Sequence, residues 1–259
     1  MIYDIFTFNG EYEMLDIRIK ILFKYVDYFV IVEANETFSG EPKEFYYEKI
    51  KHKYTNIKNK IIYHKINDTP FDVNDIGCNQ EYLRLALSSD NVTYEHVCWL
   101  KEFYQKEAIK DALKHLNDED ICYVSDIDEI WNYRIQVKFD EKIYKYNIDY
   151  CFIEYLNVRT TEDWTYFTGP ISTKYKNIKN SCLNHIRTYR KMKDIYSYIE
   201  NGGWHFNALG GINKKIESFK HPLYTLEYMK GRMNGLYIDE INLPEYILIN
   251  KENLKHLFL

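Results

Sequence analysis

Three carboxylates follow a short apolar run in the middle of the chain. Asp126, Asp128 and Glu129 come directly after residues 121–125, which have the continuous apolar pattern of a buried parallel strand. Neighbouring carboxylates repel one another, and a hard divalent cation held by oxygen ligands relieves that repulsion. Asp126 and Asp128 face the same side if the chain is extended there. The spacing predicts a metal site that could also hold a diphosphate and neutralise charge growing on it; the alternative is an acidic turn capping the next helix.

The segments before this cluster have the pattern of alternating strands and helices. Residues 2–8 and 28–32 are predicted strands, and the apolar spacing between them predicts a helix over residues 13–25, which together make a βαβ unit. A further strand is expected at 60–66 and an amphipathic helix at 101–116. This order indicates an α/β fold with a mainly parallel central sheet flanked by helices, and such sheets bind ligands at the carboxyl ends of their strands.

The remaining segments are less regular. Residues 68–93 are expected to form a long loop with a short helix near 80–87, and residues 150–156 are a strand candidate. Two glycine pairs, at 202–203 and 210–211, predict a loop between them. Because no linker-like break or internal repeat is present, we expect one domain over residues 1–259 with an irregular C-terminal half.

Composition excludes several classes of protein. A net charge of −5 lacks the electrostatic footprint of a general nucleic-acid binder. A cluster of basic residues favours a solvated face over a polyanion site: His185, Arg187, Arg190, Lys191 and Lys193. The five cysteines show no C-x-x-C spacing, so reduced and mostly buried thiols are expected. No signal peptide or membrane span is apparent, and we expect a cytoplasmic protein, of a bacterium or of a virus-infected host.

Three segments together resemble glycosyltransferase family 17. Residues 3–43 contain NGEYEMLDIR and VIVEANETFSGEPK, residues 125–130 read SDIDEI, and residues 202–206 read GGWHF, followed by IESFKH at 216–221. Each is similar to a family motif, and all three occur in the family's order. The chain departs from the family at Trp131, where a proline is usual, and at Ile216, where a lysine is usual; residues 68–93 match no family element.

The resemblance implies a GT-A-like fold and the transfer of a sugar from a UDP-sugar donor to a saccharide or glycan acceptor. It further implies N-acetylglucosamine as the sugar, Mn²⁺ or Mg²⁺ as cofactor, and inversion at the anomeric carbon. Residues 1–130 would then form the nucleotide-sugar-binding half and residues 131–259 the acceptor-binding half.

Specific residues follow from these expectations. Asp126, Asp128 and His205 are the expected metal ligands, His205 because it lies in a glycine-rich stretch and imidazole binds metals. Glu129 is expected to contact the donor sugar or to orient a ligand, or else to complement a helix dipole. Inversion needs a base for the acceptor proton, and Asp163 or Glu154 are the candidates.

A second group is expected around the nucleotide. Glu33 ends the second predicted strand and could accept hydrogen bonds from uracil or ribose; Arg18 and Lys43 are cations with which it could pair instead. Asn9 and Glu11 could line the same pocket or cap the first helix. Trp204 could stack on a sugar or belong to the core. The expected donor-binding set is therefore Glu33, Asn9, Glu11, Arg18, Lys43 and Trp204.

Two other function classes remain open from the residues alone. Paired aspartates with a divalent metal also suit a nucleotidyl or phosphoryl transferase, although no P-loop motif is present. A lectin-like carbohydrate-binding protein with a calcium site is the other alternative.

Overall fold

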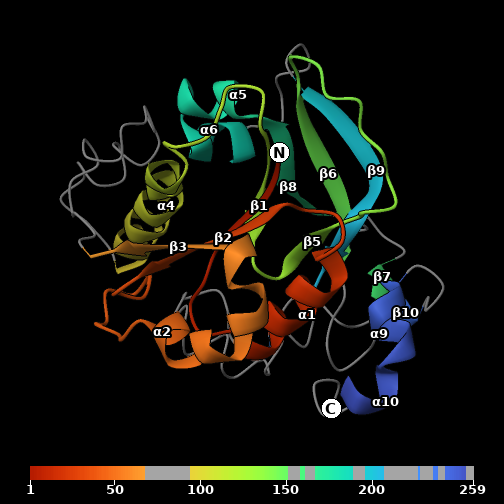
Figure 1. Ribbon diagram of the computed structural model, residues 1–259, viewed down its shortest axis with the longest axis horizontal. Helices are drawn as coiled ribbons and strands as arrows, with labels where there is room; N and C mark the ends of the chain where they lie inside the picture. The colour runs from red at the N-terminus through yellow and green to blue at the C-terminus, as the bar shows by residue number, and fades with distance from the viewer. Residues whose placement is uncertain are drawn as a thin grey trace.

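Eight strands form one mixed sheet in the order β3-β2-β1-β4-β8-β6-β9-β5 (Figure 1). The computed structural model describes residues 1–67, 94–150, 158–160, 167–188, 196–206, 227, 236–238 and 243–254. The strands of the sheet are β1 (Ile2–Thr7), β2 (Tyr28–Ala34), β3 (Ile61–Ile66), β4 (Ile121–Asp126), β5 (Glu129–Trp131), β6 (Ile143–Tyr150), β8 (Phe167–Lys174) and β9 (Tyr196–His205). A separate antiparallel pair consists of β7 (Val158–Thr160) and β10 (Leu236–Ile238).

One half of the sheet is parallel, as the sequence predicts. β1 lies between β2 and β4 and runs parallel to both, and β3 runs parallel to β2. The chain leaves β1 toward β2 on one side, whereas β4 lies on the other side, which makes the β1–β4 boundary a switch point in the topology. The carboxyl ends of β1, β2 and β4 therefore meet at one edge, and the acidic residues 126–129 lie there.

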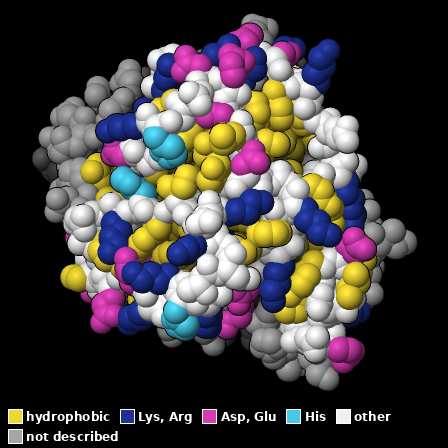
Figure 2. Space-filling view, viewed as in Figure 1, with side chains coloured by type: hydrophobic (Ala, Val, Ile, Leu, Met, Phe, Trp, Pro, Cys, Tyr) yellow, Lys and Arg dark blue, Asp and Glu magenta, His cyan; other side chains and the backbone are white. Residues whose placement is uncertain are grey.

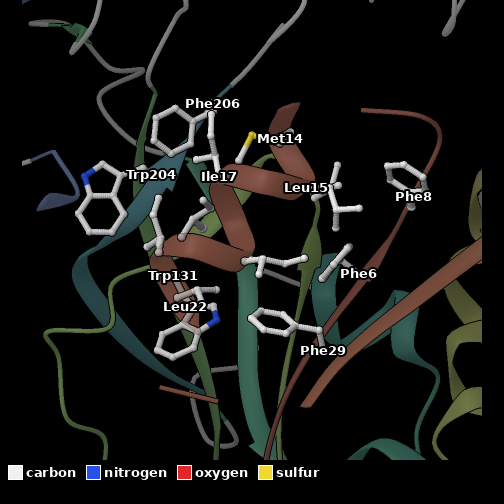
Figure 3. Close-up of a cluster of buried hydrophobic side chains, with 14 of the residues drawn as sticks. Phe6, Phe8, Met14, Leu15, Ile17, Leu22, Phe29, Trp131, Trp204 and Phe206 are labelled. Carbon is white, nitrogen blue, oxygen red and sulfur yellow. The ribbon is translucent and has the colours of Figure 1, made fainter. Parts of the chain in front are cut away.

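Helices cover both faces of this sheet. They are α1 (Tyr12–Leu22), α2 (Tyr46–Ile50), the 3₁₀ helix η1 (Lys51–Lys60), α4 (Tyr94–Ala112), α5 (Tyr175–Lys179), α6 (Leu183–Thr188), α9 (Glu245–Ile249) and α10 (Lys251–Leu254). Alternate strand residues face opposite layers. Phe6 and Phe29 pack against α1, while Ile5 and Val30 belong to the cluster that includes α4. Figure 3 shows the first cluster, with Met14, Leu15 and Ile17 of α1 close to Phe6.

Two predicted helices end earlier than their apolar patterns. The pattern over 13–25 belongs to α1, which stops at Leu22, and the pattern over 101–116 belongs to α4, which stops at Ala112. Beyond α4, single turns continue the contact: Leu113 N–H donates to Lys110 O and Leu116 N–H to Leu113 O. Apolar periodicity therefore records burial past the point where the α-helix ends.

In the half of the sheet that contains β5, β6 and β9, the loop predicted at the glycine pair 202–203 was wrong. The glycine pair 202–203 does not open a loop but lies inside β9, next to β5 and β6. A Cβ atom on Gly203 would come within 2.1 Å of Ile130 O, and one on Gly202 within 2.8 Å of Tyr146 Cβ. These glycines allow neighbouring backbones to approach closely, so they serve strand packing rather than a flexible loop.

Several expected elements cannot be compared with the structure. The predicted loop 68–93 with its short helix and the glycine pair 210–211 lie outside the described residues, and so does most of the strand candidate at 150–156, of which β6 contains the first residue. Within the part of the chain that is described, no helix combines the length and the apolar character needed to span a bilayer. Cys98 and Cys122 are buried cysteines outside any disulfide, whereas Cys182 is disulfide-bonded. The expectation of uniformly reduced thiols is thus wrong, because short spacing rules do not detect pairing between distant cysteines.

Candidate active site

A tight turn carries the carboxylates at the sheet edge. β4 ends at Asp126, Ile127 and Asp128 form the turn, and β5 begins at Glu129. We call residues 125–129 the acidic turn. Ser125 closes it from inside, because its hydroxyl donates to Glu129 O at 2.9 Å. The chain reverses here instead of staying extended, so the premise that Asp126 and Asp128 share one side of a strand is wrong.

A fully buried arginine from α1 supports the acidic turn. The Nη1 group of Arg18 donates to the carbonyl oxygens of residues 126, 127 and 129 at 2.8, 3.0 and 3.0 Å, and Nη2 donates to Ser125 Oγ at 2.6 Å. The same guanidinium forms a two-bond ion pair with Asp4 of β1, at 2.7 and 2.8 Å. Arg18 thus ties α1, β1 and the acidic turn together. It does not pair with Glu33, and the structure favours a positioning role over donor binding.

Asp126 is held between two cations. Its Oδ1 accepts from Arg187 Nη1 at 2.9 Å, and its Oδ2 accepts from Lys106 Nζ at 3.2 Å. The carboxylate remains 34% exposed. Burial alone would raise the pKa of Asp126, but the positive charges of Arg187 and Lys106 outweigh it and hold that pKa well below its usual range.

Glu129 is the buried member of the group. Its side chain is 1% exposed, and Oε2 accepts from the Asp126 N–H at 3.0 Å and from Arg187 Nη2 at 3.1 Å. Burial, with the nearby charge of Asp126, raises the pKa of Glu129. Because both of these contacts are internal, Glu129 shapes the turn and orients Arg187; its expected role toward the donor sugar or a metal ligand stays a prediction.

Asp128 and His205 form the second contact across the edge. His205 Nε2 lies 3.3 Å from Asp128 Oδ2, and the pairing of β5 with β9 sets Glu129 opposite His205. A backbone bond from Phe206 N–H to Asp128 O, 2.7 Å long, fixes the end of β9 to the acidic turn. His205 lies beside the acidic residues, as the sequence predicts, but this histidine is at the end of strand β9 and not in a loop.

Two asparagines lie beyond the neighbouring strand ends. Asn9 follows β1 and Asn35 follows β2, and in each the buried side-chain Oδ1 lacks a hydrogen-bond partner within the described part of the chain. An unsatisfied buried acceptor carries a free-energy cost that a ligand N–H or O–H can remove. Glu11 accepts from the Asn9 N–H at 2.7 Å and holds the turn between β1 and α1. The donor-binding role expected for Asn9 and Glu11 stays a prediction.

Glu33 and Lys43 have structural partners instead. The Glu33 carboxylate is fully buried and accepts from Lys43 Nζ at 2.9 Å, from Tyr63 Oη at 2.8 Å, and from the N–H groups of Tyr46 and Tyr47 at 2.6 and 3.0 Å. It therefore caps the start of α2 from a distance and pairs with Lys43, the structural alternative. Glu33 lies near the carboxyl end of β2, at the same edge of the sheet as the acidic turn, but its two oxygens already accept hydrogen bonds from these internal donors.

Trp204 also belongs to the core. It is buried with Ile130 in the cluster around α1, and Figure 3 shows Trp204 and Phe206 among the side chains of that cluster. The Trp204 ring lies 6.2 Å from that of Tyr133. A buried indole presents no free face to a sugar, so the structure favours the core alternative. Asp163 and Glu154, the base candidates, lie outside the described residues.

The carboxylates only partly fit a divalent cation as they stand. Among the described residues, no group of three or more His, Cys, Asp or Glu side chains is arranged to hold a metal ion. Asp128 and His205 offer a carboxylate and an imidazole close together, a donor pair that suits Mn²⁺. Asp126 fits the same ion only after Arg187 or Lys106 gives up its ion pair.

Sequence reasoning missed the two cations. Lys106 lies in the middle of α4 and also pairs with Glu102 one turn earlier, at 2.6 Å, which looks like an ordinary helix-surface pair in the sequence. Arg187 belongs to the basic cluster that the sequence assigned to a solvated face, and it is only 8% exposed. Figure 2 shows basic and acidic side chains interspersed on one face of the molecule.

Sequence comparisons with known proteins identify a family. The family model described as Glycosyltransferase family 17 matches residues 1–222. A human protein, β-1,4-mannosyl-glycoprotein 4-β-N-acetylglucosaminyltransferase, is 29% identical over 128 residues, which cover 47% of this chain and 20% of that protein. Its counterparts in Rattus norvegicus and Mus musculus are 29% and 28% identical over the same length and shares. The match spans about a fifth of these curated relatives, and it favours sugar transfer over the phosphoryl-transferase and lectin alternatives.

Proposed function

This chain belongs to glycosyltransferase family 17, and on that basis we propose that it transfers N-acetylglucosamine from UDP-N-acetylglucosamine to a glycan. The proposed reaction inverts the anomeric carbon and uses Mn²⁺ or Mg²⁺. The sugar is inferred from the relatives, which are named as N-acetylglucosaminyltransferases. In this proposal residues 1–130 hold most of the donor, and residues 131–259 bind the acceptor and contribute Arg187 and His205 to the donor side.

The acidic turn is the observation that carries this proposal. It lies at the carboxyl edge of the parallel strands, at the boundary of β1 and β4, where α/β sheets bind their ligands. Its backbone is anchored by the buried Arg18 and its side chains remain partly open, with Asp126 34% exposed. A rigid backbone with accessible carboxylates suits a site that must hold charged groups in one geometry.

The uridine is proposed to lie over the ends of β1 and β2. Asn9 and Asn35 have buried Oδ1 atoms without partners among the described residues. A uracil ring presents an N–H donor between two carbonyl acceptors, and an amide side chain can pair with such an edge. The single ring N–H of the base would satisfy one of these amide oxygens and a ribose hydroxyl the other, and the diphosphate would extend from there toward the acidic turn.

A metal ion would be held by Asp128 and His205, with Asp126 as a further ligand. When bound, it would neutralise the charge that develops on the departing diphosphate. The protein's own part is positional: Arg18 fixes the backbone of the turn, and Glu129 fixes Arg187. Inversion also needs a base near the acceptor hydroxyl, and Asp163 and Glu154 stay the proposed candidates because Glu129 is buried among internal partners.

Thermal unfolding in Mn²⁺ with a nucleotide panel tests the donor class. The panel contains UDP, GDP, CMP, ADP and buffer alone. A ligand that binds only the folded chain at a hundredfold excess over its Kd raises the apparent stability by about 2.7 kcal/mol. We expect UDP alone to raise the midpoint and to need Mn²⁺ for its full effect. The proposal is wrong if another nucleotide stabilises the protein more than UDP does, or if none does.

Two variants give this experiment a matched control. Asp128→Asn removes a proposed metal ligand and should reduce the Mn²⁺-dependent part of the shift. Asp111→Asn neutralises an exposed aspartate on α4 whose partner is Lys114, so it should leave the shift unchanged. Equal shifts in both variants would contradict the metal assignment while leaving the nucleotide assignment in place.

A further inference from the structure

We propose that Arg187 and Lys106 bind the phosphate oxygens of the donor, in exchange for the ion pairs that they make with Asp126 in the ligand-free protein. The inference deepens the proposed function, because it assigns the anionic part of the donor to two residues outside the family-like motifs. Both cations lie directly at the acidic turn: Arg187 Nη1 is 2.9 Å and Lys106 Nζ is 3.2 Å from the Asp126 carboxylate.

Both cations keep unused hydrogen-bonding capacity. A guanidinium has five N–H donors, and the hydrogen bonds of Arg187 to Asp126 and Glu129 use one on Nη1 and one on Nη2. Its Nε–H is buried and has no acceptor among the described residues. Lys106 uses two of its three donors, toward Glu102 and Asp126. A buried donor without an acceptor is costly, and a phosphate oxygen supplies the missing acceptor together with a matching negative charge.

The two cations are held in place as one unit. Arg187 lies on α6, and Glu107, the residue after Lys106 on α4, caps the start of that helix by accepting from the N–H groups of Leu183 and Asn184 at 2.8 and 3.2 Å. Asn184 Nδ2 in turn donates to Phe103 O at 2.7 Å. Because adjacent residues of α4 reach Asp126 and fix α6, the spacing of the two cations is set by the fold.

The local balance of charge also favours such an exchange. Three carboxylates, from Glu102, Asp126 and Glu129, share the two cations Arg187 and Lys106. If an anion without a metal ion bound both cations, the negative charges of these three carboxylates would lose their counter-charges. A diphosphate that arrives with a divalent cation brings both signs at once, so carboxylates and cations change partners without a net unpaired charge. The arrangement therefore fits a diphosphate better than a neutral sugar.

Isothermal titration with three probes tests the assignment: inorganic pyrophosphate, UDP and uridine, each with Mn²⁺. The variants are Arg187→Gln, Arg187→Lys and Lys106→Gln, with Lys114→Gln as control because Lys114 is an exposed lysine just beyond the end of α4 that pairs with Asp111. We expect Arg187→Gln to weaken pyrophosphate and UDP at least tenfold and to leave uridine unchanged. Lys106→Gln should act in the same direction, Arg187→Lys should weaken both anions less, and the control should match the wild type.

The outcomes separate this inference from the proposed function. UDP affinity that stays within twofold of the wild type in Arg187→Gln and in Lys106→Gln would overturn the inference and leave the donor assignment intact. An equal loss for uridine would also overturn it, because the residues would then be purely structural. Pyrophosphate binding that depends on Arg187 in a protein that prefers GDP would support the anion site and overturn the uridine assignment. If Arg187→Gln does not fold, Lys106→Gln and Arg187→Lys decide.

Discussion

Replacing Arg18 with methionine should damage both stability and donor binding. The methionine preserves much of the side-chain volume but removes the two-bond ion pair with Asp4 and the bonds to the acidic turn. Asp4 is fully buried, and Trp131 Nε1 still donates to it at 3.0 Å. Breaking a buried ion pair by removing one partner typically costs about 3–5 kcal/mol. We expect a loss in that range, measured by urea unfolding.

A double-mutant cycle shows whether the buried charge is the cause. Neutralising the partner in Asp4→Asn/Arg18→Met removes the uncompensated carboxylate, so the double variant should be more stable than Arg18→Met by at least about 1 kcal/mol. Arg134→Met is the control: Arg134 is exposed and donates to Leu243 O at 3.0 Å without a buried ion pair in the described part of the chain, so its loss should cost no more than about 1.5 kcal/mol. The reasoning is refuted if Arg18→Met unfolds within about 1 kcal/mol of the wild type, or if the double variant regains nothing.

Further predictions concern the sheet, the tyrosines and the acid cap of α2. Gly203→Ala should lower the free energy of unfolding by about 1–3 kcal/mol or more, because its Cβ would meet Ile130 O at 2.1 Å. Wild-type stability in urea unfolding would contradict this and show that β5 can shift to make room. Burial raises the pKa of Tyr3, Tyr47 and Tyr146 to about 12 each. The unfolded chain ionises from about pH 10, so the free energy of unfolding should fall between about pH 10 and 12, by about 1 kcal/mol per tyrosine at pH 11; an unchanged unfolding midpoint from pH 8 to 11 would contradict this. Glu33→Ala should lower stability by more than about 3 kcal/mol by leaving Lys43 buried without its partner, and an unchanged midpoint would count against the capping role.

The parallel half of the fold could be predicted because its signals are local. Continuous apolar runs predict β1, β2 and β4, and the apolar spacing between the first two predicts α1. The end of β4 was found for the same reason, since three carboxylates after a buried run stand out against any background. The order of the strands and helices along the chain, and the points where the strands end, can be inferred from short stretches of neighbouring residues.

The roles of single charged residues could not be predicted in the same way. Arg18 lies in an amphipathic helix where arginine is usually exposed, yet its partners Asp4 and Ser125 come from strands on both sides of the switch point. Glu33 ends a strand at the ligand edge, but its partners come from α2 and β3. Hydrogen bonds between residues far apart in the chain decide these roles, and one sequence contains no signal for them.

The glycine pair shows a different limit. Adjacent glycines favour a flexible loop when considered alone, but Gly202 and Gly203 lie where β9 approaches the backbones of β5 and β6 too closely for a Cβ. The same residue type serves both purposes, and only the neighbouring strands distinguish them.

Turnover of UDP-N-acetylglucosamine tests the central claim most directly. Release of UDP in Mn²⁺, with a mixture of glycans as acceptor, is measured for the wild type, Asp128→Asn and the control Asp111→Asn, all checked for equal unfolding midpoints. We expect release by the wild type and by Asp111→Asn, and at least a hundredfold slower release by Asp128→Asn. Undiminished release by Asp128→Asn would contradict the role of the acidic turn. A wild type that consumes a different nucleotide sugar and leaves UDP-N-acetylglucosamine intact would contradict the proposed donor.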